Sequence, residues 1–261
     1  EVDGIEASYR HGFGDKYKSS DATLSLGEVW ATGDAFITVN YTTNDEVYGR
    51  DRDYVQQDHT SRGGDDFRVL NCSPGHITLG DINFFLPNRL PGENRCAETD
   101  FTSLYPEQEN TRAFGNLTQS FVESVVFDVT AYYSDREVIN QGGGLLLGTG
   151  LSGSGLITAA NPFFQTIIGE PAHQVSFSYD EVFGTNAEEF TTNLSAWGIT
   201  PKLTWKINDS WNLTSSLNYG KSDNEVLEPK INPALQAAAL VSSNPLTALN
   251  PYDLSQTNPA L

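Results

Sequence analysis

The segment Trp211-Asn212-Leu213-Thr214-Ser215-Ser216-Leu217-Asn218-Tyr219 alternates between two kinds of side chain. Its odd positions are Trp, Leu, Ser, Leu and Tyr, whereas its even positions are Asn, Thr, Ser and Asn. Successive side chains of a β-strand point to opposite faces of a sheet, so a period of two indicates a strand with one apolar and one polar face. The segment therefore predicts a sheet whose two faces differ in polarity.

The same alternation recurs upstream, and helical periodicity is almost absent. Six apolar residues share one face of the preceding run, which a polar turn at 208–210 joins to the first: Trp197, Ile199, Pro201, Leu203, Trp205 and Ile207. We expect about seven strands along the chain. They fall at residues 4–10, 22–30, 35–55, 112–121, 125–138, 174–207 and 211–226.

The connections between these strands differ in length at the two ends of the sheet. Turns near residues 32, 123 and 209 are short, whereas residues 56–111, 139–173 and 227–261 form long loops. Short turns on one side and long loops on the other are typical of outer-membrane β-barrels. Aromatic residues near the strand ends are typical of interfacial girdles: Trp30, Trp205 and Trp211 near the short turns, and Tyr41, Tyr133 and Tyr179 toward the loops. The predicted fold is all-β, an antiparallel transmembrane β-barrel with long external loops.

The overall composition at first indicates a soluble acidic protein. The 261 residues include 15 Lys and Arg against 34 Asp and Glu, a net charge of −19, and the longest apolar run is only Ala237–Val241. This acidity argues against nucleic-acid binding, which needs clustered basic residues. Lipid contacts only every second residue of a barrel strand, so modest hydrophobicity is compatible with a membrane position. A secreted soluble β-sandwich that binds glycan or protein through aromatic loops remains the alternative.

Several segments resemble TonB-dependent outer-membrane receptors. Barrel strands of that family are similar to Gly4–Tyr9, Asp34–Tyr41 running into Val47–Val55, Ala196–Thr204 and Leu217–Ser222. Its external loops are similar to Asn161–Phe164, Asn232–Leu235 and Thr247–Tyr252. The resemblance implies a barrel of about 22 strands around an N-terminal plug, with a short box that contacts TonB. The chain then corresponds to the first third of the barrel, without plug or box. It lacks methionine and opens on acidic Glu1-Val2-Asp3, so we expect a processed product or a segment of a longer chain.

The same resemblance implies the function. The protein is expected in the bacterial outer membrane, in contact with lipid, where it takes up a scarce nutrient with energy from the TonB complex. The nutrient would be a siderophore, a glycan or a similar small molecule or oligosaccharide. No covalent chemistry is needed for such transport, so we predict no enzyme activity, no catalytic residue, no metal and no cofactor.

Cys72 and Cys96 lie 24 positions apart in the first long loop. In an oxidising compartment we expect a disulfide that stabilises this loop by about 3 kcal/mol. The alternative is two free thiols. No Cys-x-x-Cys motif or close pair of histidines accompanies them, which argues against zinc.

Residues 45–66 hold seven acidic side chains together with Arg50, Arg52 and Arg62. Calcium prefers such oxygen ligands, but EF-hand spacing is absent, so we expect a solvated rim with local Arg–Asp pairing. Asp58-His59 and Asp65-Asp66 are the residues that an outer-membrane protease would use as acid and base. Such pairs occur at loop rims by chance, and we keep the protease only as a minor alternative.

Aromatic and arginine side chains in the loops are the candidates for ligand contact, through stacking and charge-assisted hydrogen bonds. The candidates are His76, Arg89, Arg95, Tyr105, Phe163 and Phe164. The competing interpretation is packing of the loops themselves, above all for Phe84-Phe85-Leu86 and Phe163-Phe164. Glycines between 142 and 155 indicate a flexible loop, because no Gly-Lys-Ser/Thr follows them. One helix is expected from Asn232, its N-cap, through Leu240.

Overall fold

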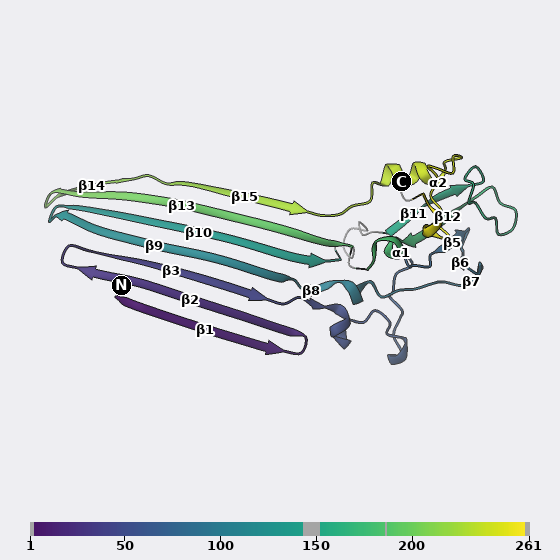
Figure 1. The fold of residues 1–261 in the computed structure, drawn as a ribbon, viewed down its shortest axis with the longest axis horizontal. Coiled ribbons are helices and arrows are strands. Elements are labelled where there is room, and N and C mark those ends of the chain that lie inside the picture. The colour runs from purple at the N-terminus through teal and green to yellow at the C-terminus, as the bar shows by residue number, and fades with distance from the viewer. Residues whose placement is uncertain (1–2, 143–151, 186, 259–261) are drawn as a thin grey trace. The chain divides into compact units, whose positions relative to one another are not determined.

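The computed structural model describes residues 3–142, 152–185 and 187–258 (Figure 1). Antiparallel β-sheet dominates, with 56% of the residues in strands. The chain divides into two compact units, each built from three stretches of sequence. The first, which we call the sheet unit, comprises Glu1–Val47, Tyr105–Ile139 and Thr191–Leu227. The second, the loop unit, comprises Tyr48–Leu104, Asn140–Phe190 and Glu228–Leu261.

The sheet unit is built on one antiparallel sheet. Its strands are β1 (Gly4–Gly14), β2 (Tyr17–Trp30), β3 (Gly33–Asn44), β9 (Glu107–Val122), β10 (Val125–Gln141), β13 (Glu189–Asn208), β14 (Trp211–Ser216) and β15 (Tyr219–Leu227). They pair in the order β1-β2-β3-β9-β10-β13-β14, and β15 also pairs with β13. The antiparallel all-β prediction is confirmed, whereas no sheet closes into a barrel among the described residues.

β14 and β15 together form one line along β13, with a break at Leu217 and Asn218. The break lies opposite Pro201, which has no backbone N–H to donate to a neighbouring strand. The Pro201 carbonyl still accepts a hydrogen bond of 3.0 Å from the Leu217 N–H. When β14 and β15 are counted as one interrupted strand, the sheet contains seven consecutive antiparallel strands, the number that the alternation predicted.

Connections at one end of the sheet are uniformly tight. Two residues each join β2 to β3, β9 to β10, and β13 to β14 (Figure 1). At the other end, residues 45–106 separate β3 from β9 and residues 142–188 separate β10 from β13. The exception at this end is the turn Asp15-Lys16, which joins β1 to β2 with Lys16 at a φ of 55°.

Two of the expected strands are shorter than the alternation predicted, because one ends early and the other is interrupted. The strand expected at 35–55 leaves the large sheet at Asn44. The next residues form the short strand β4 (Val47–Tyr48), which pairs with β8 (Ser103–Tyr105). Short 3-10 turns at Gly49–Asp51 and Asp53–Val55 then take the place of the rest of the expected strand. The strand expected at 174–207 is interrupted by the helical turn α1 (Asp180–Phe183). This turn ends at Gly184, whose φ of 84° suits glycine better than any residue with a Cβ.

The long loops contain a second sheet with a core of its own. Its order is β11 (Ser152–Thr158), β12 (Ala172–Ser178), β5 (His76–Leu79), β6 (Ile82–Phe85) and β7 (Leu90–Pro91). Helix α2 (Pro233–Leu240) begins as predicted at Asn232, whose side chain accepts from the N–H groups of Ala234 and Leu235. Further 3-10 turns cover Thr60–Arg62, Glu98–Phe101 and Leu254–Gln256. Across the described part of the chain, no helix is long and apolar enough to cross a membrane.

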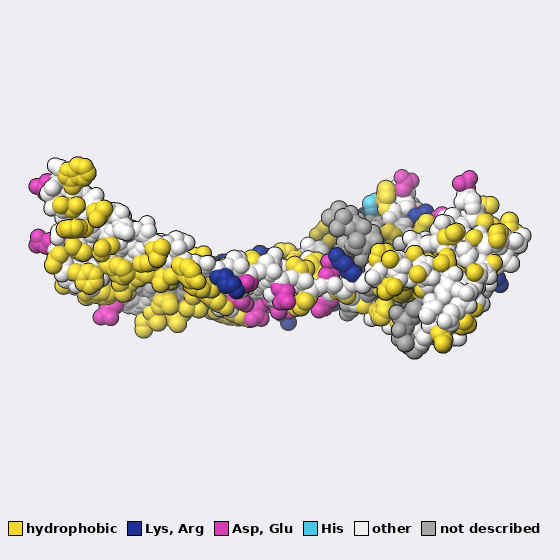
Figure 2. Space-filling model, turned by 90° about the horizontal axis from the view of Figure 1, so that it is seen from above, with side chains coloured by type: hydrophobic (Ala, Val, Ile, Leu, Met, Phe, Trp, Pro, Cys, Tyr) yellow, Lys and Arg dark blue, Asp and Glu magenta, His cyan; other side chains and the backbone are white. Residues whose placement is uncertain are grey.

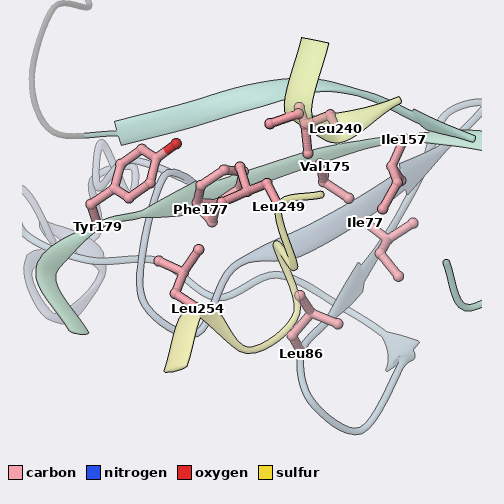
Figure 3. Close-up of a cluster of buried hydrophobic side chains, with 10 residues drawn as sticks. Ile77, Leu86, Ile157, Val175, Phe177, Tyr179, Leu240, Leu249 and Leu254 are labelled. Atoms are coloured by element: carbon pink, nitrogen blue, oxygen red, sulfur yellow. The ribbon is translucent and has the colours of Figure 1, made fainter. Parts of the chain in front are cut away.

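The core of the loop unit draws on segments far apart in the sequence (Figure 3). Ile77, Ile157 and Leu240 are fully buried, and Val175 and Phe177 are almost so. The glycine-rich stretch contributes to this packing, because a Cβ at Gly153 would collide with the Phe177 ring. Part of the predicted flexible loop is therefore strand β11, and its residues 143–151 lie outside the described residues.

Candidate functional site

One face of the large sheet is apolar and exposed. Leu24 and Leu26 in β2 lie directly opposite Val39 and Ile37 in β3, and their side chains share this face. Sixteen of the large side chains on it are more than a third exposed. They are Ile5, Tyr9, Phe13, Leu24, Leu26, Ile37, Val39, Tyr41, Tyr133, Trp197, Ile199, Leu203, Trp205, Ile207, Leu213 and Tyr219. Exposed apolar areas of this size mark contact with a membrane or another protein.

No second sheet of the described sheet unit lies against this face, because the unit contains only the one large sheet. Figure 2 shows hydrophobic side chains gathered over the sheet, most densely toward the end with the two-residue turns. We call this surface the apolar face.

The opposite face, which we call the polar face, is covered by hydrogen-bonding side chains that pair across the strands. The hydroxyl oxygens of Ser25 and Thr38 lie 2.9 Å apart, and the side-chain amide of Asn116 donates to the Thr130 hydroxyl oxygen at 3.0 Å. An ion pair of 3.2 Å joins Lys202 in β13 to Asp128 in β10. These cross-strand bonds satisfy polar side chains of this face within the sheet itself.

Two of the aromatic residues expected near the short turns, Trp30 and Trp211, lie at strand ends beside those turns, whereas Tyr133 lies in the middle of β10. Trp30 ends β2 and donates to Gln119 at 2.9 Å, and Trp211 begins β14 with 69% of its surface exposed. Tyr179, however, is buried in the core of the loop unit, where its hydroxyl donates to Gln236 at 3.0 Å. Burial raises the pKa of Tyr179 to about 12. Its assignment to a membrane girdle is therefore wrong.

The predicted disulfide between Cys72 and Cys96 is confirmed. Their Cα atoms lie 5.8 Å apart, within the usual range for a bridge. The backbone groups of Val69 and Cys96 exchange two hydrogen bonds of 3.1 Å beside it. The bridge therefore closes the segment that carries β5, β6 and β7.

Three of the predicted ligand residues pack inside the loop unit. His76 is 2% exposed, and its Nδ1 lies 2.9 Å from the Leu70 carbonyl oxygen, while burial lowers its pKa. Phe164 stacks on His173 at 4.9 Å between ring centroids, and Phe163 is half-buried beside it. These positions favour the packing interpretation.

The other three candidates have separate surroundings. Arg95 pairs with Glu93 at 2.7 Å and donates to two backbone carbonyls. Arg89 is exposed at a φ of 55°. Tyr105 is exposed in the sheet unit, with its ring 5.8 Å from that of Tyr17. Contact of the six candidates with a ligand stays a prediction.

An open polar groove of about 770 Å³ lies in the loop unit. Its lining residues include Asp66, Arg68, Asn83, Glu93 and Arg95. Hydrogen bonds from Arg68, the nearest at 2.8 Å, lower the pKa of Asp66 to about 2. The expected Arg–Asp pairing thus occurs, but through arginines outside residues 45–66. Each arginine of the groove has a carboxylate partner, so the network is self-contained.

The calcium and protease alternatives gain no support from this geometry. In the part of the chain that the structure describes, no group of three or more His, Cys, Asp and Glu side chains could hold a metal ion. Asp58 accepts hydrogen bonds from Thr60, while His59 Nε2 lies 2.7 Å from the Gln56 carbonyl oxygen. The two side chains therefore bond to neighbouring loop residues.

The sequence interpretation missed a buried polar cluster in the loop unit. His173 Nδ1 lies 2.8 Å from Glu170 Oε1, and its Nε2 lies 2.8 Å from the Tyr252 hydroxyl. Burial alone would raise the pKa of Glu170, but N–H groups of Ile168 and Ile167 hold it well below its usual value. Burial lowers the pKa of His173 and raises that of Tyr252 to about 12. Tyr252 lies 79 positions from His173, so no local sequence signal brings the two together.

Comparison with protein-family models, with curated proteins and with solved structures finds no match to this chain. The fold thus defines its class only as a mostly antiparallel β-sheet protein, with an apolar and a polar face on its large sheet.

Proposed function

We propose that the large sheet is part of the wall of an outer-membrane β-barrel, in a receptor that resembles the TonB-dependent class. The observation that carries the proposal is the exposed apolar face. A strand needs about 9–11 residues to cross the hydrocarbon layer. β1 has 11 residues, β3 has 12 and β9 has 16, so each is long enough.

The unequal ends of the sheet support an orientation for this wall. Outer-membrane barrels have short periplasmic turns and longer extracellular loops. The turns at 31–32, 123–124 and 209–210 would face the periplasm, and the loop unit would face the outside. A disulfide in that unit is compatible with an oxidising compartment.

Uptake of a scarce nutrient, energised by the TonB complex, is the function that we propose for this receptor. The loop unit would meet the nutrient first, and the polar face would line the water-filled interior. Each step is binding and passage, so no residue needs a catalytic role. The nutrient would be a siderophore, a glycan or a solute of similar size.

The alternative is a secreted β-sandwich that binds glycan or protein. A sandwich needs a second sheet to cover the apolar face of the first. The second sheet here packs against the loop unit's own core, which includes Leu240 of α2 and Leu249. This observation favours the membrane proposal.

The proposal is tested on the intact protein in the bacterium that makes it. We expect it in the outer-membrane fraction, resistant to alkaline carbonate, and with faster migration on gels before heating than after it. Growth on one limiting nutrient should be lost when either the protein or TonB is removed. A protein that is monomeric in buffer without detergent would overturn the membrane proposal, and growth indifferent to TonB would overturn the transport proposal.

A further inference from the structure

Two arginines lie close together on the polar face. Arg136 in β10 is directly opposite Asn110 in β9, and Arg112 in β9 is directly opposite Ser134 in β10. The two arginines are thus diagonal neighbours on one face, a relation that places such residues about 7–8 Å apart. Guanidinium groups on side chains of this length can converge on one small group.

Neither arginine takes part in the ion pairs that the structure shows among its described residues. Lys202 on the same face is paired with Asp128, and Arg68 and Arg95 in the loop unit are also paired. Neighbouring like charges on one face of a sheet are destabilising unless something compensates them. Two neighbouring arginines without an acidic partner among the described residues are unusual in a protein whose net charge is −19.

A buried donor without a partner lies at the same place. Arg136 Nε is buried and has no hydrogen-bond partner among the described residues, although another nitrogen of the same guanidinium donates to Gln108 at 3.0 Å. Native proteins leave few buried polar atoms unpaired, and an N–H donor of this kind suits an acceptor oxygen.

We propose that Arg112 and Arg136 form a binding site for an oxyanion, the carboxylate or phosphate group of a solute. A guanidinium presents a planar set of donors that matches two oxygens of such a group. The carboxylate of Asp21 on the same face accepts hydrogen bonds from Asn40 at 3.2 Å and from Thr23 at 3.4 Å, and it makes no ion pair with either arginine among the described residues.

The proposed site also bears on the nutrient: it adds that the transported solute carries an anionic group, and this part rests on the proposed function. As a binding site, it rests only on the register of β9 and β10 and on the unpaired Nε of Arg136. The two can therefore fail separately.

The test is calorimetric titration of the intact protein in detergent at low ionic strength, with inorganic phosphate in one arm and citrate in the other. We expect saturable binding of at least one anion, and which one binds distinguishes phosphate from carboxylate. Arg112→Gln and Arg136→Gln should each weaken it by about tenfold or more, the effect of one lost charge-assisted hydrogen bond. Circular dichroism and heat-dependent gel migration verify the fold of each variant.

The matched control is Arg10→Gln. Arg10 lies on the polar face in the same cross-strand row, but directly opposite the acidic Asp21. Its variant should bind the anion as the unaltered protein does. Absence of saturable binding in both arms, or binding that survives both Arg112→Gln and Arg136→Gln, would overturn the site. Arginine-dependent binding by a protein that needs no detergent would retain the site and reject the membrane proposal.

Discussion

Ile37 in β3 lies directly opposite Leu26 in β2, and both side chains are exposed, Ile37 by 47% and Leu26 by 39%. Cross-strand apolar pairs usually belong to a core that another layer covers. Here the pair lies on the apolar face, which carries large apolar side chains from β1 to β15. This surface is the one that the proposed barrel would turn toward hydrocarbon.

A charge placed on the apolar face should therefore be costly, whereas a charge on the polar face should be tolerated. We expect Ile37→Arg to lower the free energy of unfolding in lipid vesicles by about 2–4 kcal/mol, the cost of arginine facing lipid near the bilayer centre. Thr38→Arg, one residue along and on the polar face, is the matched control and should cost much less. Urea titration followed by tryptophan fluorescence measures both variants. Equal effects at the two positions would contradict a lipid-facing surface.

Loss of the disulfide should loosen the loop unit and leave the sheet unit unchanged. We expect the double variant Cys72→Ser, Cys96→Ser to lower the stability of the loop unit by about 3 kcal/mol, because the open loop gains freedom when unfolded. All four tryptophans lie in the sheet unit, so hydrogen exchange by mass spectrometry is the suitable measurement. Peptides from residues 69–96 should exchange faster, with sheet-unit peptides as the internal control. Unchanged exchange in 69–96 would show that the bridge contributes little.

The large sheet was predictable because each strand carries its own evidence. Alternation is a local property, and Trp211–Tyr219 displays it within nine residues. The break at Leu217 was missed because its cause, Pro201, lies in the neighbouring strand. Register depends on both strands, so a single strand's pattern does not reveal it.

The loop unit was not predictable as a folded body. Its strands are as short as two to seven residues, too few for a period to be recognised. Its core joins Ile77, Ile157, Val175 and Leu240, which only long-range contacts bring together. The disulfide could be predicted because cysteine pairing follows from residue type alone. The burial of His76 and Phe164 could not, and both were assigned to a ligand for that reason.

Asn161 should be essential to the attachment of the last segment of the loop unit. Its side-chain amide donates to the carbonyls of Ala239, Leu240 and Leu249 at 3.3, 2.9 and 3.1 Å, and the residue is 2% exposed. We expect Asn161→Ala to destabilise the unit by about 1–3 kcal/mol, because buried carbonyls lose their donor. Hydrogen exchange of residues 233–250 is the readout, and Asn88→Ala at an exposed position is the control. Equal protection in the two variants would refute this role.

The loop unit should lose stability as the pH falls through about 6.5. Burial lowers the pKa of His173 from its usual 6.5 in the folded protein, so below that pH the unfolded chain binds more protons than the folded one. His76 acts in the same direction, and the stabilisation from Glu170, whose pKa is lowered from 4.5, is lost at still lower pH. We expect weaker protection of residues 161–178 at pH 5.5 than at pH 7.5, after correction for intrinsic exchange. His173→Gln should reduce this difference, whereas the control His59→Gln, at an exposed loop position, should not. Protection that does not change between the two pH values would contradict the prediction.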